Sequence, residues 1–321
     1  MKRTTFQQLC GAALALVLAA GYAWAAAEPQ APAATGVPIR ITVTAVAKHK
    51  GGEPPALSKQ DFLVYQSHER RAVLDAVRQS GENNKLDLCI LVDEAIESDV
   101  TLDYRDINSF VRGLPPTVRV GIFYALNGTV SNTQDLTENH DAALKALRIP
   151  LGRIGAGGGI YLSVADLAKR LTPAPDRRRA IVFLSSGIDL YRGVGDMTPG
   201  LNPDLETAIH YLNRNNITVY PIYVEPVAHF ARSLYLVTNG QSCLSYLGDE
   251  TGGEAYFQGM NTPVSMTPFL EDLSHHLNNQ YLVTFAAKPG KKPGFSHLHV
   301  TTEVSGVEVT GPNNVYVPVE K

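Results

Sequence analysis

Leu88-Cys89-Ile90-Leu91-Val92 and Ala180-Ile181-Val182-Phe183-Leu184 are two uninterrupted apolar stretches in the interior of this 321-residue sequence. Strands that helices cover on both faces have this continuous apolar composition, whereas strands with one solvated face alternate. Two further strands are predicted at 118–124 and 217–224, and helical segments separate the four strands. This alternation predicts an α/β fold with a doubly wound, mainly parallel, Rossmann-like sheet.

The predicted helices have apolar side chains at helical spacing or clear start signals. Segments 107–114 and 160–171 place apolar residues three and four positions apart, which is typical of a helix with one buried face. Asn202 followed by Pro203 combines a side-chain cap with a preset φ, so a helix is predicted to begin there. Thr267-Pro268 opens the last predicted helix.

Both ends of the chain are rich in predicted strands. Strands are expected at 39–47, 62–65 and 72–77, and again at 281–285, 298–304 and 307–310. Neither end is large enough to bury a core alone. We therefore expect segment 38–80 and segment 279–318 to meet as one accessory β-sheet beside an α/β domain at 85–278.

The start of the chain has the layout of a signal peptide. Lys2 and Arg3 precede an apolar stretch at 9–22, and Ala23-Trp24-Ala25 supplies small residues for cleavage. The stretch is shorter than the ~20 residues of a spanning helix. Residues 1–25 are thus predicted to be removed, and 26–37 to form a linker rich in Ala and Pro. The protein is expected to be exported to the periplasm or outside the cell, with no integral membrane segment after cleavage.

Charge and cysteine content narrow the class of function. Lys and Arg number 28 against 31 Asp and Glu, a formal net charge of −3 that becomes −5 without Lys2 and Arg3. This balance argues against nucleic-acid binding, which needs basic groups for the phosphates. Cys89 and Cys243 remain after cleavage, and buried thiols are expected rather than a disulfide.

Several short motifs, in a fixed order, carry a family resemblance that spans roughly residues 39–318. They lie at 57–64, at Asp93 after the first central strand, at 157–162, at 181–189, at 251–257 and at 280–283. In this order the chain resembles the von Willebrand factor type A (vWA) family, and most of all its exported bacterial branch. The resemblance implies a vWA fold and a ligand site at the carboxyl edge of the sheet, where open α/β sheets bind.

The resemblance also implies which residues occupy the family's ion site. That site consists of Asp-x-Ser-x-Ser after the first strand, a Thr before a helix, and an Asp after a later strand. Asp93 matches the first position, but Ala95 and Glu97 stand at the two serine positions. Gly159 stands at the Thr position and Ser186 at the second Asp position. Because Mg²⁺ prefers oxygen ligands in octahedral geometry, we expect this site to be degenerate and to hold no metal.

Three alternatives remain for the chemistry of this region. Glu97, Asp99 or Asp189 would supply oxygens beside Asp93 to a rearranged shell for Mg²⁺ or Ca²⁺. Ser185, followed by Gly187, would serve a serine hydrolase, although Phe183 stands where a nucleophile elbow has glycine. The glycine loop at 155–159 lacks the Gly-Lys-Ser/Thr ending of a phosphate loop, so a flexible loop is the favoured interpretation.

The histidine pair His275-His276 would suit a transition metal. We expect a solvated surface instead, because the sequence places no carboxylate or thiolate cluster beside the pair.

The resemblance leads to a functional prediction. We expect a non-enzymatic vWA module that binds a protein or another cell-envelope component, as in adhesion. Contacts would come from the loops around the degenerate site, including Glu94, Gly157, Gly158 and Asp189. Another possibility is that a strand of a partner protein pairs with an exposed edge of the accessory sheet.

Overall fold

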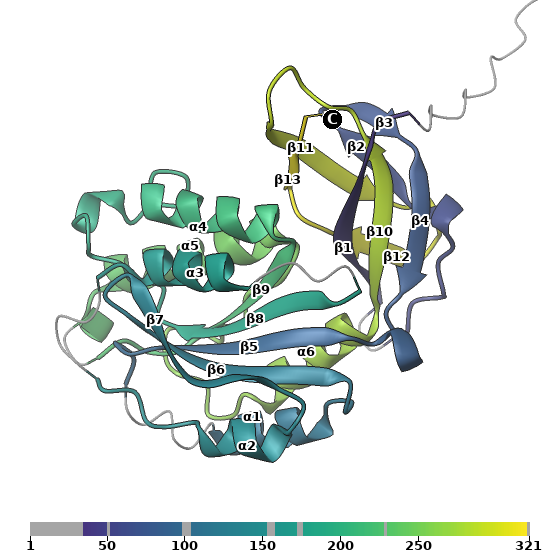
Figure 1. Cartoon of the computed structure of the whole chain (residues 1–321). Coiled ribbons are helices and arrows are strands. Elements are labelled where there is room, and N and C mark those ends of the chain that lie inside the picture. The colour runs from purple at the N-terminus through teal and green to yellow at the C-terminus, as the bar shows by residue number, and fades with distance from the viewer. Residues whose placement is uncertain are drawn as a thin grey trace, which may run out of the picture. The chain divides into compact units, whose positions relative to one another are not determined.

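The computed structural model describes residues 35–49, 52–97, 104–152, 158–171, 176–227 and 230–319 (Figure 1). The predicted signal peptide at 1–25, most of the predicted linker, Asp99 and Gly157 lie outside these residues. Within the described ranges, no helix combines the length and apolar character needed to cross a membrane.

A five-stranded sheet is the centre of the α/β module, with the order β7-β6-β5-β8-β9. Four strands are parallel, and the edge strand β7 (Thr129–Thr137) is antiparallel to its neighbour. Every residue of β5 and β8 is buried, as the continuous apolar stretches predicted. The parallel strands are β5 (Leu86–Asp93), β6 (Val118–Leu126), β8 (Arg178–Ser185) and β9 (Ile217–Tyr223).

Two layers of helices cover this sheet, one on each face (Figure 1). One layer contains α1 (Tyr104–Gly113), α2 (His140–Lys145) and α6 (Thr267–Asn278). The other contains α3 (Ile160–Arg170), α4 (Pro203–Arg214) and α5 (Leu234–Thr251). The predicted doubly wound α/β fold is therefore confirmed.

The predicted cap of α4 is also observed. The Asn202 side chain accepts hydrogen bonds from the backbone N–H groups of Asp204 and Leu205. Both described cysteines, Cys89 and Cys243, are buried free thiols, as expected.

The two ends of the chain combine, but they form two antiparallel sheets rather than the single sheet expected. The apolar faces of the two sheets share one hydrophobic core, so each sheet covers the other. The first sheet has the order β12-β1-β10-β4: Val307–Thr310, Val37–Ala47, Gln280–Ala287 and Val73–Arg78. The second has the order β13-β11-β2-β3: Asn314–Val317, Gly294–Thr301, Leu63–Gln66 and Glu69–Arg71.

Short 3-10 turns occur between these elements. They are η1 (Lys59–Asp61), η2 (Gly81–Asn83), η4 (Val194–Asp196) and η5 (Phe230–Arg232).

Arg178, at the start of β8, joins the sandwich to the α/β module and is 1% exposed. Its guanidinium donates to the backbone oxygen of Leu277 at 2.6 Å and to the side-chain oxygens of Gln280 and Asn84. Gln280 in turn donates to the Tyr220 hydroxyl at 2.9 Å. None of these partners is an anion, and burial lowers the pKa of Arg178 to about 10.

Candidate functional site

Asp93 is the last residue of β5 and is fully buried. One carboxylate oxygen accepts the backbone N–H of Ala95 at 2.9 Å, and the other accepts the Ser185 hydroxyl at 2.8 Å. Burial raises the pKa of Asp93 to about 6, against these hydrogen bonds, and the nearby charges of Asp189 and Glu94 raise it further. Both oxygens of Asp93 are therefore engaged within the chain.

Asp189 closes the opposite side of the same site. Its carboxylate accepts the backbone N–H groups of Gly159 at 2.8 Å and Tyr191 at 2.9 Å, and that of Tyr161 at 3.4 Å. Gly159 precedes α3 and has φ 76°, so Asp189 satisfies N–H groups at the positive end of that helix. Burial is the main cause that raises the pKa of Asp189. Gly158 lies beside the Tyr191 side chain.

Ser186 and Gly187 continue the chain after β8 and are held tightly. The Ser186 hydroxyl is buried and accepts the backbone N–H of Ile188 at 3.3 Å. Gly187 has φ 70°, and a Cβ there would lie 2.2 Å from the backbone oxygen of Gly240 in α5. This loop therefore packs against α5 in a way that only glycine permits.

Glu94 is buried beside Asp93 and pairs with Arg148. The Arg148 guanidinium donates to both carboxylate oxygens, and the backbone N–H of Leu151 donates to Glu94 at 2.7 Å. The guanidinium also lies 3.8 Å from the ring centroid of Tyr124. Arg148 was missed by the sequence analysis, because nothing in the sequence connects it with a residue 54 positions away.

These residues do not fit the octahedral ion site of the resembled family. Ala95 and Gly159 have no side-chain oxygen, both oxygens of Asp93 accept hydrogen bonds, and the Glu94 charge is paired with Arg148. Glu97 lies at the end of the described loop, where its backbone N–H donates to the Glu225 oxygen.

The hydrolase alternative requires a base beside Ser185. The Ser185 hydroxyl instead donates to Asp93, and its oxygen accepts the Gly187 backbone N–H at 3.0 Å. A carboxylate that holds the serine in this way orients it, but it does not form the serine–histidine pair that the hydrolase template uses.

Exposed apolar side chains lie at the carboxyl edge, around the buried polar groups whose hydrogen bonds are described above. Among the described residues, fourteen large hydrophobic side chains are exposed, and ten lie on loops or helix starts at this edge. Two hydrogen bonds connect the edge loops to the sheet ends: the Leu151 N–H donates to Glu94, and the Tyr223 hydroxyl donates to the Met260 oxygen. Within the loop after β8, the Tyr191 N–H donates to Asp189. We call these ten the apolar rim: Ile149, Leu151, Tyr191, Val194, Leu201, Leu234, Tyr235, Phe257, Met260 and Val264.

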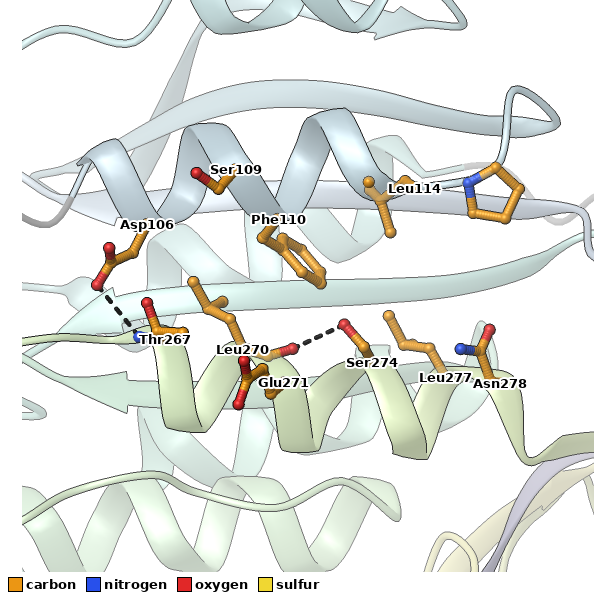
Figure 2. Close-up of a pocket in the computed structure, with 12 residues that line it drawn as sticks. Asp106, Ser109, Phe110, Leu114, Thr267, Leu270, Glu271, Ser274, Leu277 and Asn278 are labelled. Atoms are coloured by element: carbon orange, nitrogen blue, oxygen red, sulfur yellow. Dashed lines mark hydrogen bonds between the residues drawn. The ribbon is translucent and has the colours of Figure 1, made fainter. Parts of the chain in front are cut away.

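A separate groove of about 300 Å³ lies between α1 and α6, away from the carboxyl-edge site (Figure 2). Phe110, Leu270 and Leu277 line it, as Figure 2 shows. At one end Asp106 accepts the backbone N–H groups at the start of α6 and the Ser265 hydroxyl. Burial opposes ionisation of Asp106, but these hydrogen bonds outweigh it and lower its pKa. We regard this groove as part of the packing between the two helices.

No protein-family model matches the sequence, and no curated protein matches it. Similar solved structures include BatB from Bacteroides thetaiotaomicron, described as a conserved hypothetical protein, at 16% identity and a TM-score of 0.43. That comparison covers 60% of this chain and 97% of BatB.

Two other similar structures contain von Willebrand domains. The vWF domain of the type V pili tip protein Mfa5 from Porphyromonas gingivalis is 10% identical, with a TM-score of 0.42, over 60% of this chain and 95% of that one. A von Willebrand factor type A protein from Catenulispora acidiphila is 10% identical, with a TM-score of 0.42, over 89% of this chain and 75% of that one. The doubly wound sheet is the architecture that the sequence resemblance to this family implies.

Proposed function

We propose that this chain is an exported, non-enzymatic protein-interaction or adhesion module that binds a partner at the carboxyl edge of its α/β sheet. Its partner is a protein or another envelope component with an apolar, uncharged contact surface. The observation that carries the proposal is the apolar rim, since soluble proteins seldom gather so many exposed apolar side chains on one edge without a binding role.

The buried polar groups beneath the rim already have hydrogen-bond partners within the chain, which supports binding without a divalent ion. In the family that the sequence resembles, an ion at the first aspartate would accept a carboxylate from the partner. Here Asp93 is buried and has both oxygens engaged, so the interaction would come from the surrounding side chains. Glu94 and Ser186 are also buried, so a partner would reach the exposed rim rather than these two side chains.

Tyr191 and Tyr235 are suited to such contacts. They are 64% and 53% exposed, and tyrosine supplies a large apolar area with little loss of conformational entropy. A few such anchors usually carry most of the binding energy of an interface.

The proposal is tested by recovering partners from the native envelope fraction with the purified full chain. A variant with Tyr191→Ser, Tyr235→Ser and Val264→Ser removes three exposed rim side chains. The control, Leu74→Ser with Val77→Ser, removes exposed apolar side chains from β4. Recovery of specific partners should fall at least tenfold for the rim variant and stay unchanged for the control, with or without a chelator.

Two results would contradict the proposal. If the chelator and Asp93→Asn each abolish recovery, binding depends on an ion at the carboxyl edge. If the β4 control loses as much as the rim variant, the interaction is not specific to this edge. Thermal melting of both variants shows whether they remain folded.

A further inference from the structure

Three side chains with metal-ligand chemistry meet at a place separate from the carboxyl-edge site. Asp272 and His276 lie one turn apart on α6, and Glu254 lies in the segment that follows α5. The His276 Nε2 atom is 3.1 Å from a Glu254 carboxylate oxygen, and Nδ1 is 3.1 Å from an Asp272 carboxylate oxygen. One ligand atom from each residue lies within 4.8 Å of the other two.

We propose that Glu254, Asp272 and His276 bind a divalent transition-metal ion. Two carboxylates and one imidazole are a ligand set that zinc and similar ions accept, with a further coordination position left for water. Ligand atoms about 2.1 Å from a tetrahedral ion lie about 3.4 Å from one another, so the Glu254–His276 separation already suits a shared ion. Two carboxylates would neutralise the charge of the ion.

The surrounding atoms hold the imidazole as a metal-binding site requires. The backbone oxygen of Asp272 lies 2.9 Å from His276 Nδ1, where it accepts a proton carried by that nitrogen. This tautomer leaves Nε2 without a proton, and the Glu254 carboxylate lies 3.1 Å from it. The Asp272 carboxylate lies on the other side of the ring, beside Nδ1. Metal-binding histidines are typically oriented in this way, through a hydrogen bond at the second nitrogen.

A second contact orients the Asp272 carboxylate. The Tyr256 hydroxyl donates to it at 3.0 Å. Tyr256 is itself fixed beside β9, because its backbone N–H donates to Pro221 and its oxygen accepts the N–H of Tyr223, both at 2.8 Å. The Tyr256 bond and the contact with His276 Nδ1 use the same Asp272 oxygen, Oδ2, so Oδ1 is the oxygen that remains for an ion on Nε2.

The burial of the three residues gives an ion a route to the site. The His276 side chain is only 13% exposed, whereas those of Glu254 and Asp272 are 54% and 51% exposed. An ion would reach the carboxylates from solvent and then meet the imidazole behind them.

This arrangement corrects the expectation that His275-His276 is a solvated pair without carboxylates. His275 is exposed, as expected, but His276 turns inward toward two carboxylates. Glu254 could not be predicted as a neighbour of His276, because it comes from a segment 22 positions away that the fold brings alongside α6.

Calorimetric titration of the purified full chain with ZnCl₂ tests the proposal. We expect saturable binding with one site that depends on His276. His276→Ala should weaken this binding at least tenfold, and Glu254→Gln and Asp272→Asn should each weaken it. His275→Ala is the matched control on the adjacent exposed position and should leave the affinity unchanged.

Two further measurements exclude a loss of folding as the cause. The melting temperature of each variant without metal shows whether the fold persists. Tyr256→Phe retains all three ligands but loses the hydrogen bond to Asp272, so it should weaken Zn²⁺ binding about 10- to 100-fold. Co²⁺ added in place of Zn²⁺ should give visible absorption that His276→Ala abolishes.

The proposal is overturned if the folded chain shows no saturable Zn²⁺ binding. It is also overturned if His275→Ala and His276→Ala weaken binding equally. In either case Glu254, Asp272 and His276 form an ion-pair cluster that only connects α6 to the segment after α5.

Discussion

Asp93 shows how a single residue at the edge of a sheet becomes part of the fold. The Ser185 hydroxyl and the Ala95 N–H occupy the two oxygens that would otherwise face a ligand. The Ser185 hydroxyl therefore donates a hydrogen bond to Asp93, whereas in the resembled family an ion contacts this aspartate. The carboxylate remains buried and has no exposed surface for a partner.

The raised pKa of Asp93 predicts a particular pH dependence of stability. The native state holds the Asp93 proton more tightly than the unfolded state, whose pKa is near the ordinary 3.8. The stabilisation is complete below about pH 4 and is lost as pH rises through about 6. At pH 7 the loss amounts to about 3 kcal/mol.

Asp93→Asn removes this ionisation and keeps an oxygen for the Ala95 N–H. From pH 4 to pH 7, the free energy of unfolding of the variant should therefore fall less than that of the parent, by about 3 kcal/mol. Urea denaturation at several pH values measures this difference, and Asp75→Asn, at an exposed β4 position, is the control. Parallel pH profiles for Asp93→Asn and the parent would show that Asp93 is not the titrating group.

At the residue scale, the sequence could predict where a residue lies in the fold but not which residues it contacts. Asp93 and Gly159 were identified because each stands in a short motif that determines its place at the end of a strand or the start of a helix. The Ser185 partner of Asp93 lies 92 positions away, and Arg148 lies 54 positions from Glu94. Such contacts depend on the packing of the whole sheet, which local patterns do not describe.

Among the elements, helix α5 determines how closely the loop after β8 can approach. A Cβ on Gly240 would lie 2.4 Å from the backbone oxygen of Ser186, and Gly187 makes the reciprocal approach. Backbone atoms rather than flexible side chains meet there. The helix and the loop must therefore move apart if either glycine gains a side chain.

Gly240→Ala is expected to destabilise the protein by about 2 kcal/mol or more, because overpacking a tight contact forces the backbone to shift. Gly113→Ala in α1 is a matched control, since a Cβ there meets no atom within 4 Å. That substitution should be neutral or stabilise the protein by up to about 1 kcal/mol. Denaturant unfolding measures both, and equal effects at the two positions would refute the close approach.

The sequence analysis missed β3, β7 and β13 and the helices α2 and α5, because the residues of these elements show only weak apolar periodicity. Strand β7 has the sequence Thr-Val-Ser-Asn-Thr-Gln-Asp-Leu-Thr, and only Val130 is buried. It forms because its backbone pairs with β6. β3 and β13 are short strands at the edges of their sheet. By contrast, β5, β8 and α4 were predicted because burial or capping is already visible in their residues.

On the scale of the whole molecule, Arg178 is the central contact between the sandwich and the α/β module. Its three acceptors come from α6, from β10 and from the segment before β5. Burial of a cation among neutral partners is costly, and the hydrogen bonds to these three acceptors offset part of that cost, although the Arg178 Nε has no partner among the described residues. The charged run 176–179 would suggest a solvated turn from its sequence alone, but Arg178 is buried, because the fold places it between the sandwich and the α/β module.

Arg178→Ala should lower the free energy of unfolding by about 3 kcal/mol or more, because it leaves a cavity and deprives buried acceptors of their donor. Calorimetry should show one transition for the parent and two for the variant, as the sandwich and the α/β module lose their connection. Arg119→Ala, which removes a partly exposed arginine from β6 on the far side of β5, should keep a single transition. A single, slightly shifted transition for Arg178→Ala would contradict this role.

The pairing of β1 with β10 and β12 has a consequence for the order in which the protein is made. β1 leaves the ribosome early, yet Gln280, the neighbour of Thr44 across the ladder, is synthesised 236 positions later. β2 and β3 can pair with each other, but until then β1 and β4 have no partner strand, so the growing polypeptide cannot complete the sandwich. A chain that ends before β10 would therefore expose unpaired strand edges, which favour aggregation.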